Sequence, residues 1–404
     1  QYKKRGKMSI KFIHCADVHL GSPLVAASKE KKDLLNDAIE NALKNMVNLA
    51  ISENVDFVVI AGDLFDGKMT NASIGRKFKS IMKPLEENKI YTYVLFGNHD
   101  AEGKHSLTFS NSEYMKFFSA DNAETFKIEE KKIAVHGQSF KTQSVTDNLA
   151  EQYPQKVDGY FNIGVLHTSL DGRVGHDNYA PCTINDLENK NYDYWALGHI
   201  HKKEIVKETN PTIIYSGNIQ GRHSKESEEK GCFLVQIDDN HKITPTFKQL
   251  NKVEFYDIEV DIEDVDTEDE LNSKIKDNLQ KIKNDSFLKL TLKGKTELHY
   301  KINVENIKLS LPANIELVKF KNKTTFPKSA EEIAQMQDTI GTLMNCFEKQ
   351  EIVNQVEVLK QNIFNSLIDK YDDELKNELI SEININDTKY LKEIVIEQLS
   401  KAMK

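Results

Sequence analysis

The fold is decided by the stretch Phe57-Val58-Val59-Ile60-Ala61-Gly62-Asp63-Leu64-Phe65-Asp66. Its first half is an uninterrupted apolar run, which predicts a buried strand. Gly62 follows, and glycine lets the backbone turn tightly directly after a strand. The run therefore delivers the carboxylate of Asp63 to the carboxyl end of a buried strand.

Similar apolar runs flank this strand in the sequence. Residues 10–16 and 91–96 are also predicted strands. The segments between them, 29–54 and about 71–88, carry apolar residues at helical spacing. The order strand-helix-strand-helix-strand is typical of an α/β sheet with parallel strands.

Later strands follow one another more closely, with fewer helices between them. They are expected at 132–135, 161–166, 192–197, 212–215 and 232–237. A second, partly antiparallel sheet is therefore predicted. From about Val253 a small α+β unit follows, with a capping box at Thr267 and Glu270 before a helix. Residues 321–328 resemble a linker, and residues 329–404 have helical spacing.

The predicted organisation is an α/β (α+β) protein with three parts. They are a main domain at 8–250, a small α+β domain at 251–325 and a helical C-terminal region at 326–404. The polar residues 1–7 precede Met8, which we expect to be the natural start, and no signal peptide follows.

Composition limits the class of protein. No apolar run approaches the roughly 20 residues that a bilayer span requires, so no membrane association is expected. The cysteines are scattered without CxxC spacing, which favours a cytoplasmic protein. The net charge of −9 argues weakly against a whole-surface nucleic-acid binder. Any DNA binding would need a local basic patch, bound metal ions or a partner.

Residues that can bind metals follow the ends of five predicted strands. They are Asp17 and His19, Asp63, Asn98 and His99, His167, and His199 and His201. The carboxyl ends of strands are where open α/β sheets place their sites. Mixed imidazole, carboxylate and amide ligands suit Mn, Fe or Zn. A carboxylate can bridge two such ions, so we expect Asp63 to be shared by two divalent metals.

These motifs together resemble a known family. They are Asp17-x-His19, Gly62-Asp63-x-x-Asp66, Gly97-Asn98-His99-Asp100, His167 and Gly198-His199-x-His201. The pattern resembles the calcineurin-like metallophosphoesterase superfamily, most closely its DNA-repair branch of SbcD nucleases and YhaO-type relatives. The resemblance implies a two-sheet metallophosphoesterase sandwich flanked by helices, with a small capping domain after it.

The resemblance also implies roles for these residues. One metal would be held by Asp17, His19, Asp63 and His201, and the second by Asp63, Asn98, His167 and His199. His99 would contact the scissile phosphate or protonate the leaving oxygen. The most expected metal is Mn²⁺, with Fe or Zn as alternatives.

Three further residues lie near these motifs. Asp66 stands where some members of the family carry histidine, and we expect it to hold His99 in its cationic form, with a turn-capping role as the alternative. Arg222 and His223 follow a glycine-rich turn and are candidates for contacting a substrate phosphate, or else part of a surface turn.

The function implied is a metal-dependent DNA nuclease, a 3′→5′ exonuclease with single-strand endonuclease activity in double-strand-break repair. It would act with an SbcC-like coiled-coil ATPase, bound by the helical tail, and as a homodimer. Tail helices that pack on their own domain are the alternative for that region. The alternative function is a small-substrate phosphodiesterase or phosphatase, and a third is an assembly subunit with structural metals.

Overall fold

The computed structural model describes residues 10–22, 29–67, 72–102, 109–171, 179–227 and 229–327. The expected helical tail at 329–404 and the leading residues 1–7 lie outside these ranges. No helix within the described ranges is both long and apolar enough to cross a membrane.

The first sheet has the strand order β12-β11-β1-β2-β3-β4. Its parallel strands are β1 (Ile10–Cys15), β2 (Phe57–Ala61), β3 (Tyr91–Leu95) and β4 (Met115–Phe117). The helices α1 (Lys29–Ser52) and α2 (Ala72–Glu87) connect the first three of them. This confirms the predicted strand-helix alternation. The antiparallel strands β11 (Gly231–Ile237) and β12 (Ile243–Gln249) complete the sheet beside β1.

The second sheet has the order β5-β6-β7-β8-β10-β9. Its central strands run parallel: β6 (Ile133–Gly137), β7 (Phe161–His167), β8 (Tyr194–Gly198) and β10 (Thr212–Tyr215). The edge strands β5 (Glu124–Ile128) and β9 (Glu204–Lys207) are antiparallel to their neighbours. Three short helical segments lie in the connections after β3, β6 and β7, namely α3 (Asn98–Glu102), η2 (Leu149–Gln152) and α4 (Ile184–Glu188).

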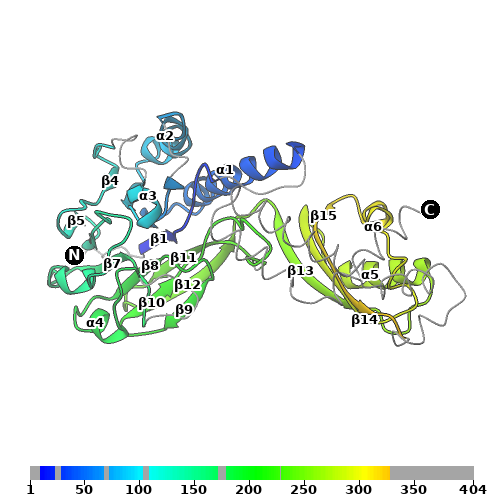
Figure 1. Cartoon of the computed structure of the whole chain (residues 1–404). Helices are drawn as coiled ribbons and strands as arrows, with labels where there is room; N and C mark the ends of the chain where they lie inside the picture. The colour runs from blue at the N-terminus through cyan, green and yellow to red at the C-terminus, as the bar shows by residue number, and fades with distance from the viewer. Residues whose placement is uncertain are drawn as a thin grey trace, which may run out of the picture. The chain divides into compact units, whose positions relative to one another are not determined.

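Alternation along the strands explains why the two sheets stack. On β2, Val58 and Ile60 pack with the helices α1 and α2, whereas Phe57, Val59 and Ala61 pack between the sheets. Successive side chains point to opposite faces of a strand, so one apolar run serves two cores. Figure 1 shows α1 and α2 on one side of the first sheet and β7, β8 and β10 on the other. The result is the helix-flanked, two-sheet fold expected from the sequence.

The layer between the sheets contains a buried polar bridge. On β1, His14 places its Nδ1 2.9 Å from the hydroxyl of Tyr194 and its Nε2 3.2 Å from the carbonyl oxygen of Leu197, both on β8. Burial lowers the pKa of His14 to about 3, so the ring is neutral. A neutral imidazole has one N–H, which it donates to Leu197 while Nδ1 accepts from Tyr194.

A third sheet has the order β13-β14-β15, formed by β13 (Glu254–Asp261), β14 (Ser286–Lys295) and β15 (Ile315–Thr325). The described residues 258–282, 290–313 and 319–327 form a second compact unit. It contains α5 (Glu268–Leu279) and α6 (Val304–Ser310). The predicted capping box is present at Thr267 and Glu270.

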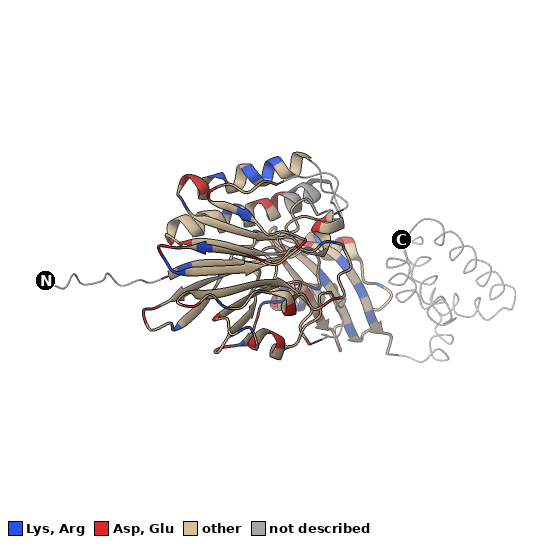
Figure 2. Cartoon of the chain, turned by 90° about the vertical axis from the view of Figure 1, so that its left-hand side faces the viewer, with Lys and Arg blue, Asp and Glu red and all other residues tan. Residues whose placement is uncertain are grey.

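Several elements differ from the sequence prediction. The strands β4, β5, β9 and β12 were not predicted, because they are short or polar edge strands whose apolar signal is weak. The predicted linker at 321–328 is wrong in its first part, because β15 continues to Thr325. The lysines of β15 occupy every second position, so they lie on one face of the strand. Figure 2 shows blue bands repeating along strands of this sheet.

Candidate metal centre

The loops after β1 and β2 run side by side and carry the first acidic residues. The main-chain N–H of Asp17 donates to the carbonyl of Gly62 at 3.0 Å, and that of His19 donates to the carbonyl of Asp63, also at 3.0 Å. Asp17, His19 and Asp63 all have left-handed backbone conformations, with φ of 51°, 49° and 49°. Such conformations are unfavourable for side-chain-bearing residues and cluster at functional sites.

Two glycines let the neighbouring strand ends approach this loop pair. A Cβ on Gly62, whose φ is +91°, would lie 2.2 Å from Nδ1 of His167. A Cβ on Gly198 would lie 1.9 Å from the carbonyl oxygen of Ala61. The glycines that precede Asp63 and His199 in the motifs are therefore required for the two sheets to meet here.

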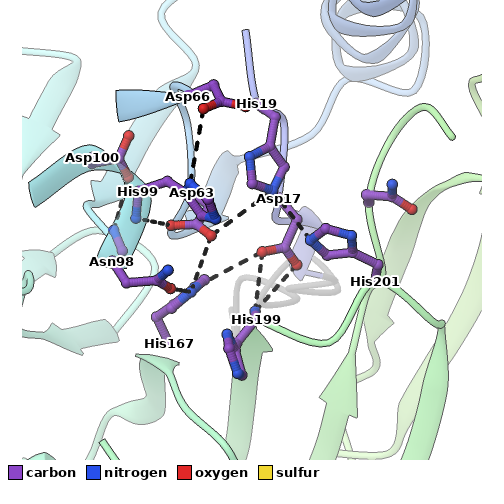
Figure 3. Close-up of polar contacts among 12 residues, drawn as sticks. Asp17, His19, Asp63, Asp66, Asn98, His99, Asp100, His167, His199 and His201 are labelled. Carbon is purple, nitrogen blue, oxygen red and sulfur yellow. Dashed lines mark hydrogen bonds and ion pairs between the residues drawn. The ribbon is translucent and has the colours of Figure 1, made fainter. Parts of the chain in front are cut away.

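Asp63 lies at the centre of the cluster and is buried. Its Oδ1 accepts the main-chain N–H of His99 at 3.0 Å. Its Oδ2 lies 3.4 Å from Nε2 of His167 and 3.8 Å from Nε2 of His19. Figure 3 shows the Asp63 carboxylate between these rings, so each of its oxygens faces a different part of the site.

Asp17 and Asn98 face His167 from two sides. Asp17 accepts the main-chain N–H of His199, at 3.1 Å and 3.2 Å from its two oxygens. Asp17 Oδ1 lies 3.9 Å from Nδ1 of His167, and Asn98 Oδ1 lies 2.9 Å from its Nε2. The ring of His199 packs edge-on against His167, with centroids 5.3 Å apart, and Figure 3 shows it pointing away from the carboxylates.

The rings of His19 and His201 face each other through their Nε2 atoms. Their Nε2 atoms are 3.1 Å apart, and both rings lie near Asp17. The other ring nitrogen of His201, Nδ1, is 2.6 Å from Oε1 of Glu226. Glu226 was not predicted, because it lies in the charge-rich stretch 224–229, whose composition indicates an exposed loop. Its side chain is nevertheless buried.

The pKa values of the buried groups are shifted in different directions. Burial raises the pKa of Asp17. Burial acts in the same direction on Asp63, but the charge and hydrogen bond of His167 outweigh it and lower that pKa. The pKa of His167 rises to about 9, because the attraction of Asp63 exceeds the effect of burial. Burial and the charge of Arg222 lower the pKa of His19, so its ring is neutral, as a metal ligand must be.

These donors fit a divalent cation. Asp17, His19 and His201 offer ligand atoms within 4.8 Å of one another, and so do Asp17, Asp63 and His167. Nδ1 of His19 is buried and makes no hydrogen bond within the described residues. Two ring nitrogens aimed at each other, beside two buried carboxylates, form the kind of mixed site that transition metals prefer.

Comparison with known proteins agrees with this geometry. The profile of the calcineurin-like phosphoesterase family matches residues 10–203. An uncharacterized metallophosphoesterase of Bacillus subtilis, YhaO, is 34% identical over 67% of this chain and 68% of its own length. The chain belongs to the calcineurin-like phosphoesterase family. Two DNA double-strand break repair proteins named Mre11 are also similar. That of Methanocaldococcus jannaschii is 23% identical over 76% of this chain and 86% of its own length, and that of Archaeoglobus fulgidus is 24% identical over 64% and 63%.

The family uses divalent metals, and the cluster above is the candidate site for them in this phosphoesterase. Asp100, the last residue of the Gly97-to-Asp100 motif, supports the cluster without facing it. Its carboxylate accepts three main-chain N–H groups, from Leu64 (3.1 Å), Phe65 (2.7 Å) and Gly97 (2.8 Å). Burial and the charge of Asp63 raise its pKa to about 8. Asp100 thus joins the loops after β2 and β3, a role that the sequence did not reveal.

The remaining candidates lie at the edge of the cluster. His99 Nδ1 lies 3.9 Å from Oδ1 of Asp66, which is an ion-pair distance rather than a hydrogen bond. Asp66 Oδ2 accepts the hydroxyl hydrogen of Ser22 at 2.8 Å and lies 3.4 Å from Nη1 of Arg222. His223 is half exposed, with Nε2 3.6 Å from Oε1 of Glu226. Asp66 and Arg222 therefore meet beside His99, while His223 faces Glu226.

Proposed function

We propose that this phosphoesterase is a metal-dependent DNA nuclease, a 3′→5′ exonuclease and single-strand endonuclease in double-strand-break repair. The observation that carries the proposal is the convergence of Asp17, Asp63, His19, His167 and His201 in a chain whose relatives include DNA double-strand break repair proteins. The similarity to the Methanocaldococcus jannaschii protein also covers more of the chain than residues 10–203 alone.

The proposed ligand sets share Asp63. One ion would be held by Asp17, His19, Asp63 and His201, and the other by Asp63, Asn98, His167 and His199. The short approaches of His167 to Asp63 and Asn98 support three members of the second set, whereas the ring of His199 would have to turn toward them to join it. Mn²⁺ is the proposed metal, with Fe or Zn as alternatives. When bound, the two ions would activate water for attack on phosphorus and offset the negative charge of the phosphate.

The protein residues beyond the ligands have separate tasks in this proposal. His99 is anchored by its main-chain N–H to Asp63, and its Nδ1 makes no hydrogen bond within the described residues. The ring can therefore contact the phosphate and donate a proton to the leaving oxygen. Asp66 would attract the protonated ring, and Arg222, next to Asp66, would contact a phosphate oxygen. His223 would contribute a second, more exposed phosphate contact.

The wider assignment follows the family relatives. We propose a nuclease domain at 8–250, a capping domain at 251–325 and a helical region at 326–404 that binds an SbcC-like coiled-coil ATPase. A cytoplasmic homodimer is proposed as the working form, as for SbcD-type nucleases. The double-strand break repair role in the names of the Mre11 relatives supports a DNA substrate, although the net charge of the chain is negative.

The test compares two substrates under Mn²⁺. Duplex DNA labelled at the 3′ or 5′ end and a small bis-phosphodiester are given to the wild type, to His99→Gln and to His241→Asn. His241 is an exposed residue in a turn between β11 and β12, so His241→Asn is the matched control. We expect digestion of both labelled duplexes by the wild type and the control. His99→Gln should be slower by about 10²-fold or more, the usual contribution of a general acid.

The outcomes separate the candidate functions. Hydrolysis of the small ester without digestion of DNA would refute the nuclease and favour a small-substrate phosphodiesterase. Equal rates for His99→Gln and the wild type would show that His99 takes no part in the reaction.

A further inference from the structure

His201 is held through both of its ring nitrogens. Its Nε2 points to Nε2 of His19 at 3.1 Å, and its Nδ1 lies 2.6 Å from Oε1 of Glu226. Glu226 comes from the segment between β10 and β11 and is only 7% exposed. A buried carboxylate at this distance from an imidazole decides which ring nitrogen carries the proton.

The second oxygen of Glu226 is also occupied. Oε2 accepts a hydrogen bond from Nδ2 of Asn218 at 2.9 Å and one from the main-chain N–H of Arg222 at 2.7 Å. Asn218 Nδ2 and the Arg222 amide can only donate, so Glu226 is surrounded by donors if His201 donates as well. An ionised carboxylate accepts from all three donors.

The other candidate metal cluster has a weaker counterpart. Nδ1 of His167 lies 3.0 Å from the carbonyl oxygen of Ala61, which is a neutral acceptor. A carboxylate polarises an imidazole more strongly than a carbonyl does, and partners of this kind set the orientation and strength of metal-binding histidines. The two clusters therefore differ in the group that stands behind the histidine.

We propose that Glu226 is a positioning residue that fixes His201 in the Nδ1–H tautomer, keeps its Nε2 lone pair available to a divalent cation, and makes the Asp17/His19/His201 cluster the tighter of the two metal sites. This inference rests on the metal assignment in the proposed function. It adds an order of filling: the set of Asp17, His19, Asp63 and His201, which is backed by Glu226, binds its ion first, and the set of Asp63, Asn98, His167 and His199 binds second.

The substitution Glu226→Gln tests the tautomer directly. The glutamine has one oxygen, and the donors Asn218 and Arg222 compete for it. With that oxygen facing them, its NH₂ group faces Nδ1 of His201, which must then accept. The proton of His201 moves to Nε2, where it points at His19 and blocks a cation. Glu226→Asp keeps the charge and should recover part of the effect.

Mn²⁺ binding to the full chain is measured by calorimetry and by electron paramagnetic resonance. The wild type should bind two ions with unequal affinities. Glu226→Gln should weaken the tighter step by about 10- to 100-fold and leave the weaker one unchanged. Glu229→Gln is the matched control, because Glu229 lies on the same segment but is largely exposed and pairs with Lys203. It should behave like the wild type.

Two further measurements separate positioning from a general structural role. In the metal-free protein with ¹⁵N-labelled histidine, nuclear magnetic resonance should show the Nδ1–H tautomer for His201 and the Nε2–H tautomer in Glu226→Gln. The double variant Glu226→Gln/His201→Gln should bind Mn²⁺ like His201→Gln alone, since Glu226 acts through that ring.

Unchanged Mn²⁺ affinities in Glu226→Gln, an unchanged tautomer, or further loss in the double variant would overturn the inference while the metal assignment stands. A wild type that binds no Mn²⁺ would instead refute the metal assignment itself, and this inference with it.

Discussion

The helix α5 in the smaller unit agrees with the structural preferences of its own sequence, whereas the strand ends that carry Asp63 do not. At the start of α5, Thr267 and Glu270 cap each other, and the buried residues Leu271, Ile275 and Leu279 recur at helical spacing. The charged side chains of Lys293 and Glu259 pair in the same unit with almost half of each exposed. Every one of these features is local, and each agrees with the preference of the sequence around it.

The strand ends depart from those preferences. Asp17 and Asp63 are buried carboxylates in left-handed backbone conformations, and Nδ1 of His19 is buried without a hydrogen bond within the described residues. Each feature costs stability unless the surrounding structure compensates. Substitutions at the strand ends should therefore change chemistry first, whereas substitutions in α5 should change only stability.

The largest effect is expected for Asp63→Asn. Loss of the shared carboxylate should reduce Mn²⁺-dependent turnover by about 10³-fold, because preorganised charge is the largest catalytic contribution. Metal analysis should find fewer than two ions bound. The control Asp257→Asn, which removes a partly exposed partner of Lys289, should retain both ions and full turnover. Two tightly bound ions in Asp63→Asn would contradict the bridging role.

The next effect concerns folding stability and the buried His14 between the two sheets. The pKa of His14 is about 3 in the folded chain and 6.5 in its ordinary state, so below pH 6.5 the unfolded chain takes up a proton that the folded chain refuses. Folding stability therefore falls as the pH drops towards 3. His14→Gln keeps one donor and one acceptor and should remove that loss, which amounts to about 2–3 kcal/mol between neutral pH and pH 4.5.

Urea unfolding in EDTA at both pH values measures this effect. The control is His241→Gln at an exposed histidine in a turn, which should lose as much stability on acidification as the wild type. If His14→Gln lost as much stability on acidification as the wild type, protonation of His14 in its bridge to Tyr194 and Leu197 would not be linked to folding.

A smaller effect is expected for Asp66→Asn. Removal of the charge near His99 and Arg222 should slow turnover by about tenfold, the loss of one charged partner in a partly exposed place. Both metals should stay bound, because Asp66 stands outside the proposed ligand sets. Turnover across pH is the readout, and a variant that loses a metal ion or keeps full activity would leave Asp66 as a turn-capping residue.

The smallest effect is expected for Thr267→Ala. Removal of the cap should lower the free energy of unfolding by about 1 kcal/mol, the usual contribution of an N-cap hydroxyl. Thermal unfolding measures the change, while Mn²⁺ binding and turnover should equal those of the wild type. A loss of turnover here would mean that the cap of α5 and the strand ends that carry Asp63 are coupled.

The sequence predicted those elements whose signal lies in a local pattern of apolar and polar residues. The apolar runs of β1, β2, β3, β7 and β8 end in polar residues, and both the strands and their ends can be read without knowing the fold. The strands β9 and β12 could not be read in this way, because each lies at a sheet edge and its side chains are only partly buried. Their pairing depends on neighbours that are distant in the sequence.

The same limit applies to the site. Asp17, Asp63 and His167 were identifiable because each lies at the end of a strand. Glu226 lies among exposed charged residues and becomes buried only when its segment packs against His201. Asp100 was visible as part of a motif, yet its task of binding three main-chain N–H groups depends on a loop 35 residues away. Residues that support a site through tertiary contacts leave no local signal.

The hydrogen bonds that join the loops after β1 and β2 have one more consequence. Asp17, His19 and Leu20 donate in turn to Gly62, Asp63 and Leu64, so the parallel ladder continues beyond the sheet. An insertion or deletion of one residue in either loop would shift Asp17 against Asp63 by about 3.3 Å, the rise of a strand residue. We therefore expect the lengths of these two loops to stay fixed in any variant that retains the site. Changes in substrate range should arise from residues around the site instead.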